Sequence, residues 1–332
     1  MKRRLLALLL VSCLLCGCQS PGEEPRKLME YGLFDTVTTI LAAPDYAGDF
    51  EAQAREILSE LEEYHRLLDI YQEYEGLVNL KTLNDQAGKA PVQVEPRLMD
   101  FLLKCREYYE LTDGLVNPAL GSVLQLWHWA REEGLQDPEH SRLPEPQALQ
   151  AAAEHCRMED VILDPAEGTV YFRDPLLKLD AGALGKGWAA EQVCGSLPSG
   201  LLVSVGGNVR ATGPKGQEPW TVGIQDPEDP GQYAAGFPLN RGSAVTSGDY
   251  QRYYEVEGKR YHHIIDPGTG MPGGRWRSVT VVTEDSGLAD CLSTALFLMD
   301  RDSGQQLLDR VGAEALWIDG QGEIFRSPGF PK

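Results

Sequence analysis

The sequence lacks several features that would assign it to a common class of protein. It has 30 lysine and arginine residues against 50 aspartate and glutamate residues, giving a formal net charge of −20 over 332 residues. Such an acidic chain repels phosphate backbones, so we expect no nucleic-acid partner. An anionic small molecule would need a local device: a metal ion, a helix N-terminus or glycine-rich backbone. There is no internal repeat and no low-complexity tract, which favours a globular fold.

Cysteine is scarce, and familiar catalytic motifs are absent. Beyond Cys18 the chain has four widely spaced cysteines and no Cys-x-x-Cys, so a zinc ribbon or a dithiol redox motif is not supported. We expect buried free thiols, with a disulfide as the alternative. No His-Glu-x-x-His or Gly-x-Ser-x-Gly motif occurs, which excludes the zincin and hydrolase-elbow sites.

The N-terminus has the layout of a bacterial lipoprotein leader. A basic start precedes an apolar run that is too short to span a bilayer, and Leu15-Cys16-Gly17-Cys18 resembles a lipobox. We therefore expect a signal peptide over residues 1–17, a lipidated tether over 18–30 with the lipid on Cys18, and one domain over 31–332. The protein would then be lipid-anchored to the cell membrane on its extracytoplasmic side. An ordinary secretory leader with a chance cysteine is the alternative.

Hydrophobic periodicity predicts an α+β fold. The β-branched segment 36–41 predicts a strand, and an apolar stripe from Ile57 to Tyr71 predicts a helix. A second helix is expected around 98–109, then a surface loop over 132–146. In the second half, strands alternate with glycine-bearing turns, interrupted by helices near 188–194 and 288–299. The pattern is that of a single domain with a mixed, largely antiparallel sheet and flanking helices.

The densest candidate site is Asp180-Ala181-Gly182-Ala183-Leu184-Gly185-Lys186-Gly187, which enters a helix. Three glycines let backbone N–H groups approach a phosphate, the helix dipole favours an anion, and Lys186 adds a cation. The segment matches neither a P-loop nor Gly-x-Gly-x-x-Gly. A plain strand-to-helix turn remains an equal alternative.

Two further clusters carry chemistry of their own. His262-His263 stands close to Asp266-Pro267 in a glycine-rich turn, as a positioned acid–base group requires; the alternative is strand histidines with an Asx turn. Asp290 and Thr294 stand four apart on one face of the expected helix, and both are oxygen ligands of the kind Mg²⁺ takes. Alternatively, Asp290 merely favours the helix N-terminus. The glycines after strand 201–205 indicate either a close ligand approach or a hairpin.

Together these segments resemble the ApbE family, the bacterial FAD:protein FMN transferases, from about Leu33 to Phe325. The resemblance is carried by five anchors in the family's order, at 180–187, 205–208, 246–250, 263–272 and 290–294. In this chain Phe34-Asp35-Thr36 stands where many members have Met-Gly-Thr, and Leu115-Val116-Asn117 replaces the usual Ala-Phe-Asp.

The resemblance implies an α+β fold and covalent flavinylation. FAD would be split at its diphosphate with Mg²⁺, FMN would join a threonine hydroxyl of an extracytoplasmic flavoprotein, and AMP would leave. It implies Asp290, Thr294 and the carbonyl of Ala183 as metal ligands, and His263 as the candidate base. It implies as FAD contacts Phe34, Tyr71, Leu115, Val116, Asn117, Asp180, Lys186 and Ile264. Hydrolysis of FAD to free FMN and AMP, and non-catalytic flavin binding, are the alternative functions.

Overall fold

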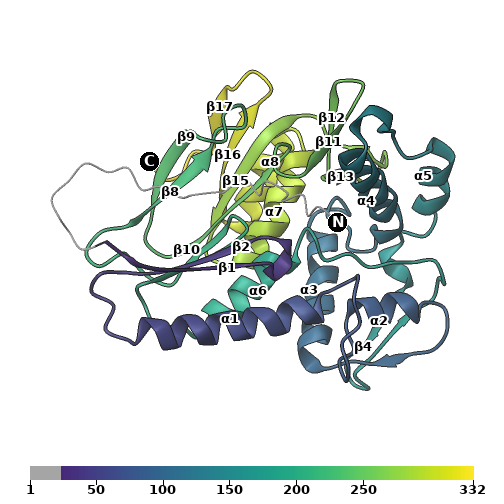
Figure 1. The fold of residues 1–332 in the computed structure, drawn as a ribbon, viewed down its shortest axis with the longest axis horizontal. Coiled ribbons are helices and arrows are strands. Elements are labelled where there is room, and N and C mark those ends of the chain that lie inside the picture. Colours follow the sequence, from purple (N-terminus) through teal and green to yellow (C-terminus); the bar gives the residue numbers. More distant parts are fainter. Residues whose placement is uncertain (1–23) are drawn as a thin grey trace, which may run out of the picture.

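The computed structural model describes residues 24–332, and its centre is an eight-stranded sheet in the order β1-β2-β6-β7-β10-β15-β16-β17 (Figure 1). Every neighbouring pair in this sheet is antiparallel, so the predicted α+β class and largely antiparallel sheet are confirmed. The strands of this sheet are β1 (Arg26–Tyr31), β2 (Val37–Ala42), β6 (Leu201–Val205), β7 (Asn208–Ala211), β10 (Gly242–Gly248), β15 (Trp276–Thr283), β16 (Glu314–Asp319) and β17 (Ile324–Arg326).

Smaller sheets surround the central one. The hairpin of β8 and β9 packs on one of its faces, and the others lie among the helices and loops. Their strands are β3 (Val92–Gln93), β4 (Val161–Asp164), β5 (Thr169–Phe172), β8 (Trp220–Gln225), β9 (Tyr233–Leu239), β11 (Tyr253–Val256), β12 (Lys259–His262), β13 (Ile265–Asp266) and β14 (Met271–Pro272).

Helices cover the opposite face of the central sheet. The α-helices are α1 (Phe50–Leu67), α2 (Leu80–Asp85), α3 (Pro96–Leu111), α4 (Gly121–Gln136), α5 (Pro146–Ala153), α6 (Gly185–Cys194), α7 (Ser286–Leu298) and α8 (Arg301–Val311). Short 3-10 turns occur at η1 (Leu33–Asp35), η2 (Pro138–His140) and η3 (Met158–Asp160). Figure 1 shows α1 and α6 below strands β1 and β2, and the β8–β9 hairpin above them. Within residues 24–332, no helix is long and apolar enough to cross a bilayer.

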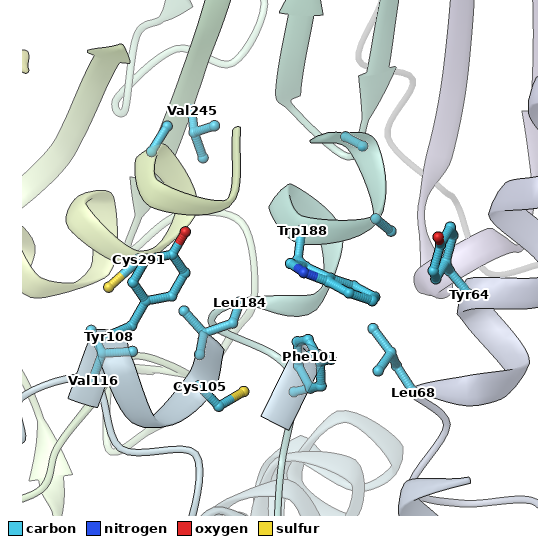
Figure 2. Packing of buried hydrophobic residues seen from close by; sticks show 14 of the residues in the cluster. Tyr64, Leu68, Phe101, Cys105, Tyr108, Val116, Leu184, Trp188, Val245 and Cys291 are labelled. Carbon is cyan, nitrogen blue, oxygen red and sulfur yellow. The ribbon is translucent and has the colours of Figure 1, made fainter. Parts of the chain in front are cut away.

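The main core lies between the helices and the sheet. Trp188 of α6 packs against the rings of Tyr64 from α1 and Phe101 from α3, with ring centroids 5.1 and 5.0 Å apart (Figure 2). Ile40 of β2 is fully buried on the same side of the sheet. A smaller core on the other face holds the β8–β9 hairpin against the sheet. The main core fixes α6 and α7 relative to the strands.

Most predicted elements are present, with three differences. Tyr71 lies beyond the end of α1, because the helix stops at Leu67 and the chain turns. The expected loop at 132–146 begins inside α4, which continues to Gln136. The strand β1 begins at Arg26, so the sheet starts within the segment assigned to the tether. Residues 1–23, which include the signal peptide and Cys18, lie outside the described residues.

The four cysteines of the described chain are free thiols, as expected. Cys105, Cys194 and Cys291 are buried in helices, and Cys156 is partly buried. Burial raises the pKa of the Cys194 thiol to about 12, which suppresses the reactive thiolate. The cysteines therefore serve as core residues.

Candidate active site

One large cavity of about 2340 Å³ brings the predicted site residues together. They come from segments as far apart as η1 and α7. The cavity is lined by all twelve of them: Phe34, Tyr71, Leu115, Val116, Asn117, Asp180, Ala183, Lys186, His263, Ile264, Asp290 and Thr294. The positions of these residues in the sequence do not show that they meet. The fold therefore gives an independent reason to treat them as one site.

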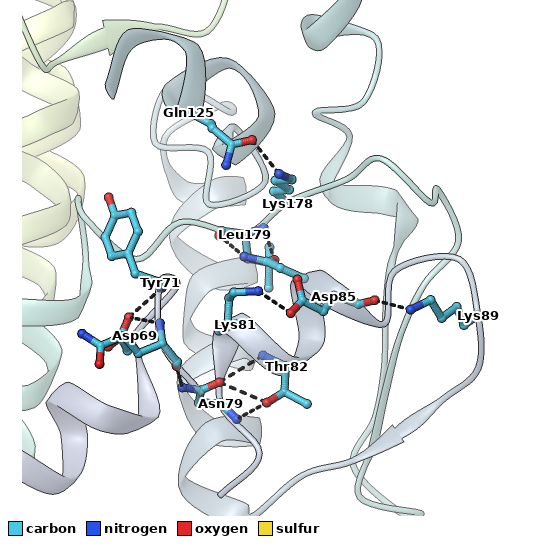
Figure 3. Close-up of polar contacts among 12 residues, drawn as sticks. Asp69, Tyr71, Asn79, Lys81, Thr82, Asp85, Lys89, Gln125, Lys178 and Leu179 are labelled. Atoms are coloured by element: carbon cyan, nitrogen blue, oxygen red, sulfur yellow. Dashed lines mark hydrogen bonds and ion pairs between the residues drawn. The ribbon is translucent and has the colours of Figure 1, made fainter. Parts of the chain in front are cut away.

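The loop that leads into α6 is held by hydrogen bonds on both sides. Asn84 of α2 donates to the carbonyl of Leu179 and accepts from its N–H, at 2.9 and 2.7 Å (Figure 3). The N–H of Asp180 donates to Pro118, and its carboxylate accepts from the N–H of Gly182 at 2.7 Å. The backbone before α6 is therefore fixed in place, as a phosphate cradle requires.

Gly187 explains how α6 can lie so close to α7. A Cβ on this residue would stand 2.4 Å from the Cβ of Asp290 and 2.4 Å from the carbonyl oxygen of Ser286. The N–H of Gly187 donates to Oδ2 of Asp290 at 2.8 Å. The glycine therefore allows the two helices to approach and orients the Asp290 carboxylate. This is a structural reason for glycine where a P-loop has serine or threonine.

Asp290 is a buried carboxylate rather than a helix cap. Its side chain is 4% exposed, whereas the N-cap of α7 is Asp285, which accepts from Leu288. Burial raises the pKa of Asp290, and the nearby Lys186 ammonium opposes that rise. The helix-start alternative for Asp290 is therefore wrong.

The donor atoms at this place suit a hard cation. Asp290 supplies a carboxylate, Thr294 a hydroxyl one turn later, and Ala183 a backbone carbonyl, all lining the cavity. Mg²⁺ prefers oxygen ligands and completes its shell with water and substrate phosphates. Residues 24–332 contain no cluster of three His, Cys, Asp or Glu side chains arranged around a metal. The three oxygen donors are of the type that a hard divalent cation binds.

Three cations surround His263 in the cavity. Arg252, Lys186 and Arg131, together with burial, lower the pKa of His263 from 6.5 to about 3, with burial as the largest cause. His263 Nδ1 lies 3.2 Å from the carbonyl oxygen of Arg252. A carbonyl oxygen only accepts, so Nδ1 carries the proton and Nε2 keeps its lone pair. The site thus combines a neutral histidine with a local positive field in an acidic protein.

Arg131 and Arg252 were not predicted from the sequence. Arg252 follows the 246–250 anchor directly, and Arg131 lies on α4, a helix whose apolar pattern was not singled out. Nothing in the one-dimensional pattern separates these two arginines from surface cations. Only their place on the cavity wall identifies them.

His262 and Asp266 bear on the two alternatives for this cluster, which are a positioned acid–base group and strand histidines with an Asx turn. His262 Nε2 lies 2.6 Å from the carbonyl oxygen of Gly273, and Asp266 accepts from the N–H of Gly268 in an Asx turn. The His262 ring and the Asp266 carboxylate are thus bonded to backbone within the fold, although His262 lines the cavity beside His263. Similarly, Gly206 and Gly207 form the two-residue turn between β6 and β7, both with positive φ, so the hairpin alternative applies there.

The opposite wall carries aromatic groups on an unusual backbone. Phe34 and Asp35 have φ of 52° and 53°, a left-handed conformation that is uncommon outside glycine. The N–H of Phe34 donates to His65 Nδ1 at 3.2 Å. The backbone N–H of Tyr71 donates a hydrogen bond to Oδ1 of Asp69 at 2.6 Å (Figure 3). The centroid of its ring lies 5.3 Å from that of His128. The residue is 55% exposed, so its ring is available to stack on a planar ligand.

The segment Leu115–Asn117 lines the cavity, and two of its three side chains are used within the fold. Val116 is 2% exposed and belongs to the core. Asn117 donates to Cys156 and accepts from the N–H of Ala119, so its amide is used within the fold. Ile264 is likewise 6% exposed. These residues shape the wall, and their side chains have little left to offer a ligand.

Comparison with known proteins adds a family to this geometry. A family model described as the ApbE family matches residues 34–317. Among curated relatives, a protein of Treponema pallidum (strain Nichols) is 33% identical, covering 92% of this chain and 89% of its own length. One from Klebsiella pneumoniae (strain 342) is 30% identical over 85% of this chain and 86% of its own. Both carry the name FAD:protein FMN transferase.

Solved structures agree with the fold. The ApbE protein of Thermotoga maritima superposes with a TM-score of 0.82 at 30% identity, covering 92% of this chain and 98% of that one. A mutant of the flavin transferase ApbE from Vibrio cholerae gives a TM-score of 0.76 at 25% identity, covering 92% of this chain and 98% of that one.

Proposed function

This chain belongs to the ApbE family, and on that basis we propose that it is an FAD:protein FMN transferase. The observation that carries the proposal is the single cavity that joins all twelve predicted residues. In the finer form of the proposal, the enzyme moves the FMN part of FAD to a threonine hydroxyl of an acceptor flavoprotein and requires Mg²⁺.

The reaction exchanges a phosphoanhydride linkage in FAD for a phosphoester linkage to threonine. The threonine oxygen forms a bond to the phosphorus of the FMN half, and the bond from that phosphorus to the bridging oxygen of the diphosphate breaks. AMP leaves with that oxygen, and the proton of the hydroxyl goes to a base and then to solvent. No oxidant or reductant is needed.

The cations of the cavity suit the diphosphate of FAD. Lys186 lies at the start of α6, where its ammonium donates to the carbonyl of Gly182 at 3.1 Å, and Arg252 and Arg131 line the same cavity. Anions bind at helix N-termini and beside cations because both stabilise negative charge. Tyr71 and Phe34 offer ring faces for the isoalloxazine.

Asp290, Thr294 and the carbonyl of Ala183 would hold Mg²⁺, which when bound supplies charge neutralisation at the phosphorus and the leaving group. In the protein alone Gly187 orients the Asp290 carboxylate. Asp290→Ala should therefore abolish the Mg²⁺-dependent rate and leave a folded chain.

His263 is suited to accept the proton of the incoming hydroxyl. Burial and, to a smaller extent, the surrounding cations lower its pKa and keep it neutral, and its Nε2 is available. A bound diphosphate would offset the charges of Lys186, Arg252 and Arg131, which raises the proton affinity of the imidazole when the substrate is present. The base would thus become stronger in the complex.

The decisive experiment combines the full-length chain in detergent with FAD, Mg²⁺ and an acceptor flavoprotein domain. In-gel flavin fluorescence on the acceptor and AMP release are measured together. We expect labelled acceptor and AMP in equimolar amounts. Neither product should form with an acceptor whose threonine is replaced by valine. AMP without labelled acceptor would indicate hydrolysis, and FAD binding with neither product would indicate a flavin-binding protein.

We also propose that Cys18 carries a lipid that anchors the enzyme on the extracytoplasmic side of the membrane. The support is the lipobox-like order of residues 15–18 after an apolar run. An enzyme in that position would modify flavoproteins outside the cytoplasm.

A further inference from the structure

The cavity is larger than a flavin nucleotide needs. Pockets for small molecules usually measure about 300–1,000 Å³, and this one is about 2340 Å³. Beyond the site it continues along the face of the central sheet that carries the β8–β9 hairpin. At its far end it is lined by Lys27, Asp45 and Lys215.

The lining residues of this extension, which we call the sheet groove, show what forms its floor. From β2 only alternate residues line it, Val37, Thr39 and Leu41, and from β6 only Leu202 and Ser204. Alternate residues share one face of a strand, so the floor is the outer face of β2 and β6. The hairpin core reaches one end of this floor, where it includes Leu202 and packs against Leu41. Val37, Thr39 and Ser204 line the cavity and lie outside that core.

The wall of the sheet groove is different. From β8 the successive residues 220–223 all line it. Successive side chains point to opposite faces, so the cavity meets the backbone edge of the strand. Among the described residues β8 pairs only with β9, so this edge is in no sheet ladder. The sheet groove therefore offers an open strand edge above a floor of alternating side chains.

Such geometry fits an extended polypeptide that adds a strand to a sheet edge. The floor from Val37 to Leu41 spans four residue steps, about 13 Å at about 3.3 Å each. At one end lie Asn208 and Thr246, which line the same cavity as Asp290. A bound strand would thus lead straight to the reacting phosphate.

We propose that the sheet groove binds an extended segment of the acceptor protein, paired with the edge of β8, and presents its hydroxyl residue at the Asn208 end. This inference rests on the proposed function, because the occupant is the protein substrate. Every second side chain of the segment faces β2 and β6, so small or apolar residues are favoured there. The backbone pairing supplies affinity that does not depend on sequence.

The experiment places bulky side chains on the floor of the sheet groove and leaves the active-site residues unchanged. Thr39→Tyr and Ser204→Tyr change two partly buried residues that are cross-strand neighbours. Thr169→Tyr on β5, also partly buried but outside the cavity, is the matched control. For each full-length variant in detergent, the KM for the acceptor domain and the Kd for FAD are measured, with near-UV circular dichroism as the check on folding.

We expect the two sheet-groove variants to raise the acceptor KM about tenfold, the effect of losing about 1.4 kcal/mol of binding. The FAD Kd of these two variants should stay at the wild-type value. In the Thr169→Tyr control, both the acceptor KM and the FAD Kd should stay at wild-type values. A large rise in the FAD Kd would mean that the groove holds the adenosine half of FAD, and would overturn the proposal. An unchanged acceptor KM in both folded variants would overturn it equally.

A binding assay separates this proposal from the proposed function. A fluorescein-labelled decapeptide spanning the acceptor threonine is titrated with the wild-type chain, without FAD, and its anisotropy is followed. N-methylation of alternate peptide amides removes strand pairing and should weaken binding about tenfold. Equal binding of the two peptides would refute the edge pairing. An absence of FMN transfer by the wild type would instead refute the proposed function.

Discussion

At the scale of single residues, the site depends on one close contact between two helices. Gly187→Ala would add a Cβ where two atoms of α7 already stand 2.4 Å away, one of them backbone. Alanine improves helix propensity by about 1 kcal/mol, but overpacking typically costs about 1–3 kcal/mol. We expect a lower melting temperature together with loss of transferase activity.

Thermal unfolding and the AMP-release assay test this expectation. Gly274→Ala is the control, because a Cβ there meets no atom within 4 Å and the residue does not need a positive φ. If Gly187→Ala kept both the wild-type melting temperature and full activity, the described approach of α6 to α7 would be refuted.

His263 makes stability depend on pH in a defined direction. Its pKa is about 3 in the folded chain and near 6.5 in an unfolded one, so between those values the unfolded state binds more protons. The free energy of unfolding therefore decreases as pH falls from about 6.5 towards 3. His263→Gln removes this dependence, so the variant should lose less stability in acid.

Urea unfolding at pH 7.5 and pH 5 measures the effect. The difference in unfolding free energy between the two pH values should be smaller in His263→Gln than in wild type. His140→Gln, at an exposed histidine beside Asp137, serves as the matched variant. Identical acid losses in all three chains would contradict the depressed pKa.

At the scale of secondary-structure elements, Arg277 of β15 ties the β8–β9 hairpin to the loop that carries Arg252. Its guanidinium forms ion pairs with Asp249, at 2.6 Å, and with Glu228 near the hairpin tip. The Arg277 side chain is only 18% exposed, so solvent screens the Asp249 pair weakly. This contact holds the hairpin tip beside the active site.

Arg277→Gln should loosen both segments. We expect a fall of a few degrees in melting temperature, since removing one partner of a half-buried pair leaves the other carboxylate uncompensated. Limited proteolysis should cut the 226–232 turn faster than in wild type. Pairing the variant with Asp249→Asn in a double-mutant cycle isolates the coupling. Additive effects of the two changes would show that the ion pair does not link the elements.

At the scale of the whole molecule, three cationic side chains of an acidic protein lie in one cavity. The net charge is −20, yet Arg131, Lys186 and Arg252 all line the same hollow. Carboxylates such as Asp35, Asp180 and Asp290 line the cavity as well, so an anionic ligand would depend on local contacts with these cations and not on the charge of the cavity as a whole. The sequence suggested a metal, a helix N-terminus or glycine backbone for this purpose, and the structure adds the two arginines.

Anchoring is also a property of the whole chain. In a bacterial host, the full-length protein should sediment with membranes, and Cys18→Ala should shift it to the soluble fraction of the same compartment. A chain of residues 24–332 should retain FAD binding, because the twelve site residues named above lie in that range. Cell fractionation with immunoblotting tests the location, and a Cys16→Ala variant controls for loss of a cysteine as such. Membrane association of Cys18→Ala would contradict lipidation at Cys18.

The sequence by itself determined the local structure and the types of residue available for chemistry. The apolar run before two glycines specifies β6 correctly to the residue, and the apolar stripe of α3 specifies its buried face. Asp290 and Thr294 share a face because of helical spacing alone. Ordered anchors along the chain also sufficed to indicate the family, since its motifs are local in sequence.

Only the tertiary structure decided which of these residues meet and which are used internally. It separated His263 from His262, assigned Asn117 to the fold, and brought Arg131 and Arg252 to the cavity. It also left the edge of β8 open above β2 and β6. The physical reason is that sheet order, helix packing and burial join segments more than 200 residues apart, and no periodicity along the chain encodes those contacts.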